Sequence, residues 1–285
     1  MNGGSGRATP IALVLGGIIS VQCGAAAATK LFDDVGPVGT VMMRLVFAAV
    51  VLLVIWRPAL GALRGRHAAD LIAFGVALAA MNTSFYLALD RIPLGIAVTF
   101  EFIGPLGVAI ASSRRRLDLV WALFAGAGIV LLSPTPGSDL DLLGVVLALV
   151  AGGFWAAYIV LTARIGQAFS GGQGLALAML VASALILVPG VVAGGSELLD
   201  PGPLAIGFAV AILSSAIPYS LELEALRRLA RGTFGVLMSL EPAVAATIGF
   251  LALGQDLSVL ELVAIGLVVI ASAGALRTAP PPAEG

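Results

Sequence analysis

Ten apolar runs, each ending at charged or turn-forming residues, take up almost the whole chain. A helix of about 20 apolar residues crosses the hydrocarbon core of a bilayer, and in lipid its backbone groups must be hydrogen-bonded internally. A hydrophobic fraction of 60% against 11% charged residues also excludes a soluble globular fold. We therefore predict an all-α membrane protein with ten transmembrane helices. They cover about 10–30, 37–56, 69–89, 93–112, 118–133, 141–163, 173–193, 203–224, 232–253 and 258–276.

One apolar segment occurs twice. Residues 88–110 align with residues 225–247 at a constant offset of 137. The identical positions are Ala88 and Ala225, Leu89 and Leu226, Arg91 and Arg228, Gly95 and Gly232, and Pro105 and Pro242. Five helices per half is an odd number, so the second half would cross the membrane upside down, with a substrate path between the halves. We predict inverted five-helix repeats at 8–135 and 139–277 and a disordered tail at 278–285; a chance match of two similar helices is the alternative.

The positive charges of the loops predict the orientation, because lysines and arginines collect on the cytoplasmic side. If the N-terminus is cytoplasmic, only Lys30 and Arg91 fall outside. The inside then receives Arg7, Arg57, Arg64, Arg66, Arg114, Arg115, Arg116, Arg164, Arg227, Arg228, Arg231 and Arg277. Both termini are therefore expected in the cytoplasm. The first run also fits a cleaved signal peptide, but nine further spans favour an uncleaved helix.

Three ionisable residues lie near the middle of predicted spans, where each costs on the order of 3 kcal/mol and so indicates a function or a buried partner. Arg44, near the middle of the second helix, could hold an anionic group such as a substrate carboxylate. It could equally lock helices together through an ion pair or backbone carbonyls. Glu101 and Glu241 lie near the centres of the fourth and ninth runs, and Glu241 aligns with Gly104. Both are candidates for proton coupling or for a substrate amine, with a structural, arginine-paired glutamate as the alternative.

Other polar and aromatic residues inside the spans complete the candidate site. Gln22 and Asn82 are candidates for hydrogen bonds to a zwitterion, although polar contacts between helices are equally common. Trp155, Tyr158 and Tyr219 lie away from the interfaces where aromatic residues collect, and they are candidates to line a cavity.

Three prolines within the apolar runs are expected to bend helices. Pro105, Pro218 and Pro242 each lack the N–H that an earlier carbonyl would accept. Free carbonyls at this depth suit a cavity, and a packing kink is the alternative.

The sequence carries no motif for a metal, a cofactor or a nucleic acid. Cys23 is the one cysteine and His67, in an arginine-rich loop, the one histidine. These counts exclude multi-cysteine metal sites and Ser-His-Asp chemistry within the membrane. No P-loop or dinucleotide-binding glycine pattern occurs. We therefore expect neither a cofactor nor a bound metal, and no enzymatic activity.

Essentially the whole chain resembles the drug/metabolite transporter superfamily with EamA-type repeats, and within it the threonine/homoserine exporter family. The most specific stretches are 217–229, 233–246 and 271–275, and Arg44 matches the arginine typical of the second helix. Gln255 departs from the pattern, which usually has glutamate after the glycine. The resemblance implies a carrier of the bacterial inner (plasma) membrane. It would export small amino acids or related metabolites in exchange for protons, by alternating access.

Two other transport or membrane functions stay open. The first is a drug or other metabolite carrier of the same superfamily. The second, more distant, is a non-transporting membrane subunit or an intramembrane enzyme; the enzyme would need a histidine, a Ser/Lys pair or clustered acids with a metal in mid-membrane. The expected partners are a small-molecule substrate, protons and the lipid bilayer, and a homodimer is left open.

Overall fold

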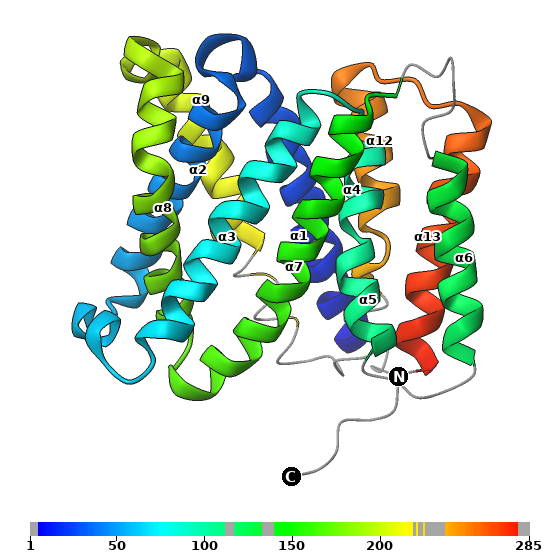
Figure 1. Ribbon diagram of the computed structural model, residues 1–285, viewed down its shortest axis with the longest axis horizontal. Coiled ribbons are helices and arrows are strands. Elements are labelled where there is room, and N and C mark those ends of the chain that lie inside the picture. The colour runs from blue at the N-terminus through cyan, green and yellow to red at the C-terminus, as the bar shows by residue number, and fades with distance from the viewer. Residues whose placement is uncertain are drawn as a thin grey trace.

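The computed structural model describes residues 5–111, 117–132, 140–218, 221, 225 and 237–278. These residues form helices joined by short turns, and no strand occurs among them (Figure 1). The helices are α1 (Ser5–Thr29), α2 (Phe32–Trp56), η1 (Leu60–Arg64), α3 (Ala68–Leu89), α4 (Leu94–Glu101), α5 (Ile103–Ala111), α6 (Leu117–Leu132), α7 (Leu142–Ala168), α8 (Gln173–Gly194), η2 (Gly195–Leu199), α9 (Pro201–Ala211), η3 (Ile212–Ala216), α12 (Glu241–Leu253) and α13 (Val259–Thr278).

The apolar helices fit a membrane protein. Five of them, α1, α2, α3, α7 and α8, are long and apolar enough to cross a bilayer. The other predicted segments coincide with shorter apolar helices at Leu94–Val108, Val120–Leu131, Pro201–Ala216, Glu241–Leu253 and Val259–Gly274. Large apolar side chains also face outward, Val130 and Leu251 at 71% exposure and Val192 at 79%. The predicted all-helical class is confirmed, and the apolar outer surface suits lipid rather than water.

Helices far apart in the sequence pack against one another. α2 lies along α8, α6 along α13, and α4 along α12, while α3 contacts both α7 and α8. α1 contacts α9, η3 and α12. In Figure 1 the start of α1 and the end of α13 lie at the same lower edge of the bundle. The early and late helices therefore interleave in one bundle.

The fourth predicted span is broken in the middle. α4 ends at Glu101, Phe102 forms a turn, and α5 begins at Ile103. Pro105 lies four residues after Glu101 and has no N–H to donate to the Glu101 carbonyl. Gly152 of α7 lies against that carbonyl, close enough that a Cβ on Gly152 would be 2.5 Å from its oxygen. The bend expected from Pro105 is confirmed as a break.

The ninth span is broken at the corresponding place. Residues 239 and 240 form a turn, and α12 then begins at Glu241 with Pro242 in its first turn. The turn at Ser239 lies 137 residues after the turn at Phe102, which is the offset of the sequence repeat. The apolar runs alone predict both acids near helix centres. Instead Glu101 ends α4 and Glu241 begins α12, because the prolines interrupt the helices there.

The eighth span contains a π-helical turn. α9 continues into η3, where the N–H of Ile217 bonds to the carbonyl of Ile212, five residues earlier. Pro218 follows directly and cannot donate to the carbonyl of Ser214. π turns of this kind free backbone carbonyls and are common at functional sites.

Candidate functional site

Arg44 joins three helices in the middle of the bundle. Its Nη1 donates to the hydroxyl of Tyr86 on α3 at 3.1 Å, and its Nη2 donates to the freed carbonyl of Ser214 at 3.3 Å. The guanidinium carbon also lies 5.4 Å from the centre of the Tyr86 ring. The backbone-carbonyl bond that the sequence left as an alternative for Arg44 is therefore present. Its Nε is buried and has no hydrogen-bond partner among the described residues.

Gln22 and Glu241 form a second buried link. The Nε2 of Gln22 on α1 donates to Oε1 of Glu241 on α12 at 3.1 Å, and the two residues are 2% and 6% exposed. The Oε1 of Gln22 is buried without a hydrogen-bond partner in the described part of the chain. Two residues before Gln22, the Ser20 hydroxyl donates to the carbonyl of Leu213 in η3 at 2.7 Å. α1 is thus held between α12 and the π turn.

Glu101 completes the group. It is 8% exposed, and its carboxyl lies within electrostatic range of both Glu241 and Arg44. Four sequence-predicted residues, Gln22, Arg44, Glu101 and Glu241, therefore come together in the middle of the bundle. With Tyr86 and Ser214 they form what we call the central cluster.

Sequence reasoning missed Tyr86, Ser214 and Ser215. Tyr86 is fully buried, and the hydroxyls of Ser214 and Ser215 are buried without hydrogen-bond partners among the described residues. Tyr86 lies within the third apolar run, near its end, and a polar hydroxyl inside such a run was a usable signal. Ser214 could have been found from Pro218, because a proline frees the carbonyl four residues earlier. Within the described residues, no group of three or more His, Cys, Asp or Glu side chains is placed to hold a metal.

The remaining predicted site residues lie apart from these hydrogen bonds. Asn82 donates to the Leu78 carbonyl of its own helix at 2.8 Å. Trp155 packs edge-on against Phe102, next to Glu101, with ring centres 5.5 Å apart. Tyr158 packs against Phe74 at 5.3 Å. Tyr219 lies outside the described residues.

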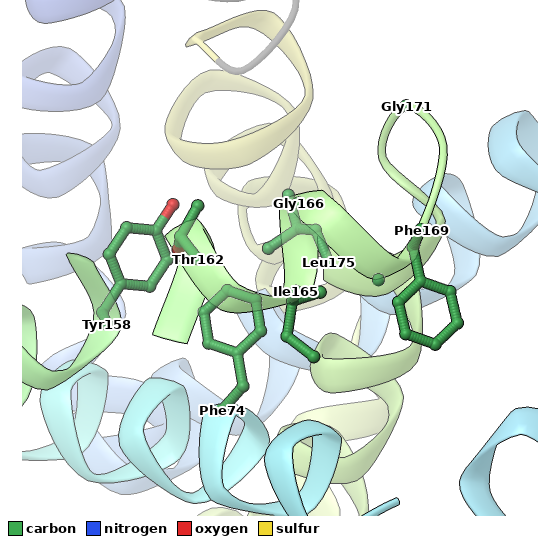
Figure 2. Close-up of a pocket in the computed structure, with 9 residues that line it drawn as sticks. Phe74, Tyr158, Thr162, Ile165, Gly166, Phe169, Gly171 and Leu175 are labelled. Carbon is green, nitrogen blue, oxygen red and sulfur yellow. The ribbon is translucent and has the colours of Figure 1, made fainter. Parts of the chain in front are cut away.

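A pocket lies at the lower end of the bundle, between α3, α7 and α8. Figure 2 shows Phe74 of α3 pointing toward α7, with Ile165 and Leu175 beside it and Phe169 near the α7–α8 turn. Tyr158 and Thr162 add two hydroxyl groups to the lining. We call this pocket the α7 slot. Tyr158 therefore lies in the mainly apolar lining of this pocket and not in the central cluster.

Two polar contacts tie the helices together at the opposite, upper end. Gln255 Oε1 accepts a hydrogen bond from the N–H of Leu94 at the start of α4, at 3.0 Å. Arg91 forms an ion pair with Asp141 at 3.1 Å, both side chains being 38% exposed. The N–H of Gly144 donates to Asp141, and this bond together with Arg91 lowers the pKa of the Asp141 carboxyl. An amide at position 255 thus serves as an acceptor where an acid is the usual residue.

Comparisons with known proteins decide the family. The threonine/homoserine exporter RhtA of Escherichia coli (strain K12) is 43% identical over 273 residues, covering 94% of this chain and 92% of the relative. The RhtA of Salmonella typhimurium (strain LT2) is 40% identical over 272 residues with the same coverage. The profile of the EamA-like transporter family matches residues 142–277. The chain belongs to the EamA-like transporter family. It is a multi-pass inner-membrane transporter and not an enzyme.

The fold agrees with a solved protein structure as well. A protein known from a crystal structure superposes on this EamA-type transporter with a TM-score of 0.64. The superposition covers 94% of this chain and 98% of the other. The two sequences are 19% identical, so the likeness shows the shared fold alone.

Proposed function

We propose that this transporter exports small amino acids of the threonine/homoserine kind, or related metabolites, across the inner membrane in exchange for protons. The observation that carries the proposal is the central cluster, in which the half-buried Arg44 lies with two buried carboxyls and a buried amide. A zwitterion needs a cation for its carboxylate and an acceptor for its amine, and the cluster has both. The 43% identity to exporters of threonine and homoserine supports the substrate class.

We further propose ten helices in two inverted repeats, 8–135 and 139–277, with both termini cytoplasmic and a disordered tail at 278–285. Three packing pairs support this. In each pair, a helix of the first half packs against the helix that has the same position in the order of the second half. The pairs are α2 with α8 (second of each half), α4 with α12 (fourth) and α6 with α13 (fifth). The breaks at Phe102 and Ser239, separated by the repeat offset, support it too.

In the proposed mechanism the two halves rock around the central cluster, which opens in turn to either side. Two hydrogen bonds of the cluster join the halves, Arg44 to Ser214 and Gln22 to Glu241. A proton on Glu241 turns a charge-assisted bond with Gln22 into a weaker neutral one, and so loosens the link between α1 and α12. Proton binding thereby changes the populations of the two facing states.

The roles within the proposed site differ by residue. Arg44 is the candidate residue to bind the substrate carboxylate. Its Nε is an available donor, because it has no hydrogen-bond partner among the described residues. Glu101 and Glu241 are the candidates for proton binding or the substrate amine. Their helix dipoles act on them with opposite sign, because Glu101 ends α4 and Glu241 begins α12. The candidate lining residues are Gln22, Asn82, Trp155, Tyr158 and Tyr219.

The test is uptake of labelled threonine and homoserine into inside-out vesicles, with and without an imposed proton gradient. We expect gradient-dependent accumulation, reduced at least about tenfold in Arg44→Ala because the charge-assisted hydrogen bond proposed between the guanidinium and the substrate carboxylate is lost. Lys30→Ala, an exposed residue outside the cluster, serves as the matched control. Accumulation no higher than in empty vesicles would remove the amino-acid assignment.

A second candidate function is a drug or other metabolite carrier of the same superfamily. The aromatic pairs Phe102 with Trp155 and Phe74 with Tyr158 favour it, because such rings suit flat apolar substrates. The same vesicles distinguish the two by competition. Inhibition of threonine uptake by aromatic amines, stronger than by homoserine, would favour the drug carrier.

A further inference from the structure

The ring of Tyr86 is enclosed by other aromatic side chains. Tyr86 lies near the end of α3 and is fully buried. Its ring centre lies 6.0 Å from that of Phe32 on α2 and 6.1 Å from that of the adjacent Phe85. Side chains in a close-packed interior keep one rotamer on the time average. The hydroxyl at the end of this ring therefore has a well-defined position.

That hydroxyl holds one end of the Arg44 guanidinium. Nη1 donates to the Tyr86 hydroxyl at 3.1 Å, and the guanidinium carbon lies 5.4 Å from the centre of the same ring, within the range of a cation–π contact. Phe32 and Arg44 both belong to α2, so Tyr86 contacts α2 through its ring and through its hydroxyl. An arginine side chain loses much rotamer freedom when it is ordered. Tyr86 orders this one before any ligand binds.

The other end of the guanidinium is held by a different kind of partner. Nη2 donates to the Ser214 carbonyl at 3.3 Å, which is longer than the bond from Nη1 to Tyr86. The carbonyl is a neutral acceptor, and a carboxylate forms a stronger hydrogen bond with a guanidinium. A carboxylate that accepts from Nε and Nη2 would compete with Ser214 and leave Nη1 on Tyr86. Of the two partners, Tyr86 is therefore the one expected to stay in place when substrate binds.

The Nε of Arg44 is the donor that these two partners leave for a ligand. It is buried and has no hydrogen-bond partner among the described residues. Glu101 lies within electrostatic range of Arg44, but it does not accept a hydrogen bond from this Nε. A buried donor without an acceptor is costly, so such a donor in a native fold calls for an explanation. A substrate carboxylate supplies the missing acceptor.

We propose that Tyr86 is a positioning residue for the substrate carboxylate. It fixes the Arg44 guanidinium through Nη1, so that Nε and Nη2 face the carboxylate without a search among arginine rotamers. This assignment rests on the proposed function, in which Arg44 binds the carboxylate of an amino acid. Pre-ordering of this kind strengthens binding because less rotamer freedom is lost when the ligand arrives.

The first measurement is thermal unfolding of the full-length protein in detergent, for the wild type, Tyr86→Phe, Arg44→Met and the double variant. Tyr86→Phe keeps the ring and removes the acceptor, while Arg44→Met keeps an unbranched stem and removes the donors. We expect Tyr86→Phe to lower the melting temperature by about 2–4 °C in the wild-type background. In the Arg44→Met background it should lower it no further, because the hydroxyl there has lost its donor. Equal losses in both backgrounds would overturn the proposal.

The second measurement is the rate of threonine uptake into inside-out vesicles over a range of concentrations. In Tyr86→Phe the half-saturating concentration should rise about tenfold, with little change in the maximal rate, because binding energy is lost without loss of a group that acts in translocation. Ser84→Ala is the matched control. It removes a buried hydroxyl from the same helix, but that hydroxyl donates to the Ala80 carbonyl and not to Arg44.

A lower maximal rate at an unchanged half-saturating concentration in Tyr86→Phe would assign Tyr86 to helix packing alone and overturn the proposal. The same shift in Ser84→Ala would overturn it too, because the effect would not depend on Arg44. The unfolding measurement needs no substrate. Absence of threonine uptake by the wild type, with the dependence of Tyr86→Phe on Arg44 intact, would therefore count against the proposed substrate and support the positioning of Arg44.

Discussion

Arg44 has a structural role and a proposed substrate-binding role. One N–H of Nη1 donates to the Tyr86 hydroxyl and one N–H of Nη2 donates to the Ser214 carbonyl, while Nε is buried without a hydrogen-bond partner among the described residues. A substrate carboxylate that accepts from Nε and Nη2 in the proposed site would share Nη2 with the carbonyl freed by Pro218. We expect this competition to weaken the bond between α2 and η3, and so to couple substrate binding to helix packing.

Substitution of the two buried glutamates should distinguish proton coupling from substrate exchange. Glu101→Gln and Glu241→Gln keep the shape and the hydrogen-bond acceptor but cannot titrate. We expect the gradient-driven part of threonine accumulation to fall at least about tenfold in one or both, within the range that positioned acid–base groups contribute. Exchange of labelled for unlabelled threonine without a gradient should persist.

The matched control for these variants is Glu261→Gln, at the first turn of α13 and outside the central cluster. It should leave both measurements unchanged. Gradient-driven accumulation at wild-type levels in both Glu101→Gln and Glu241→Gln would refute proton coupling through these acids.

Sequence reasoning found the charged members of the site but not their partners. Arg44, Glu101 and Glu241 stand out because charge inside an apolar run is costly. Tyr86 and Ser214 are uncharged, so the cost of burying a charge does not mark them, and their pairing with Arg44 follows only from the way α2, α3 and η3 meet. Gln22 was predicted to hydrogen-bond a zwitterion, with a polar contact between helices as the alternative. Its bond to Glu241 spans 219 residues and follows only from the packing of α1 on α12.

At the scale of the helix, proline and glycine act together. Pro105 breaks the fourth span, and glycines let α7 approach the break so closely that the Gly104 Cβ position falls on the carbonyl of Gly152. Each predicted apolar run coincides with an apolar helix among the described residues. The apolar runs alone do not show where these helices are interrupted. Pro105 and Pro242 predict bends there, but a bend becomes a break only in the packing of the whole bundle.

Gly104→Ala should destabilise the α5–α7 contact. The added methyl group meets backbone rather than a flexible side chain, and overpacking of this kind costs about 1–3 kcal/mol. Gly107→Ala, three residues along α5 where an added Cβ meets open space, should be neutral or stabilising. Thermal unfolding in detergent measures both. Equal melting temperatures for the two variants would mean that α5 shifts freely on α7.

At the scale of the molecule, contacts at the upper end hold the halves together. Arg91 in the α3–α4 turn pairs with Asp141 at the start of α7, and Gln255 bonds to the first N–H of α4. Both contacts join residues before 135 to residues after 139. In the proposed cycle they would have to separate when the outer side opens.

The Asp141 contact predicts a dependence of stability on pH. Its pKa is lower in the folded protein than the ordinary value of 3.8, so its contribution is fully present above that value and is lost as the pH falls through the folded-state pKa. We therefore expect Asp141→Asn to lower the melting temperature near neutral pH. The difference from wild type should vanish in strong acid. A difference independent of pH would show that Asp141 acts through its shape alone.

The position of α1 has a consequence for how the protein is made. α1 belongs to the first half by sequence, but its hydrogen-bonded partners are Leu213 and Glu241. It is the first helix to leave the ribosome, and its partners are synthesised some 190 to 220 residues later. Until Glu241 has been synthesised, Gln22 lacks the hydrogen-bond partner that it has in the complete bundle. α7 differs from α1 in this respect, because its main packing partners are made before it. These are α3, α4 and α5. We therefore expect assembly to be complete only when η3 and α12 have packed against α1.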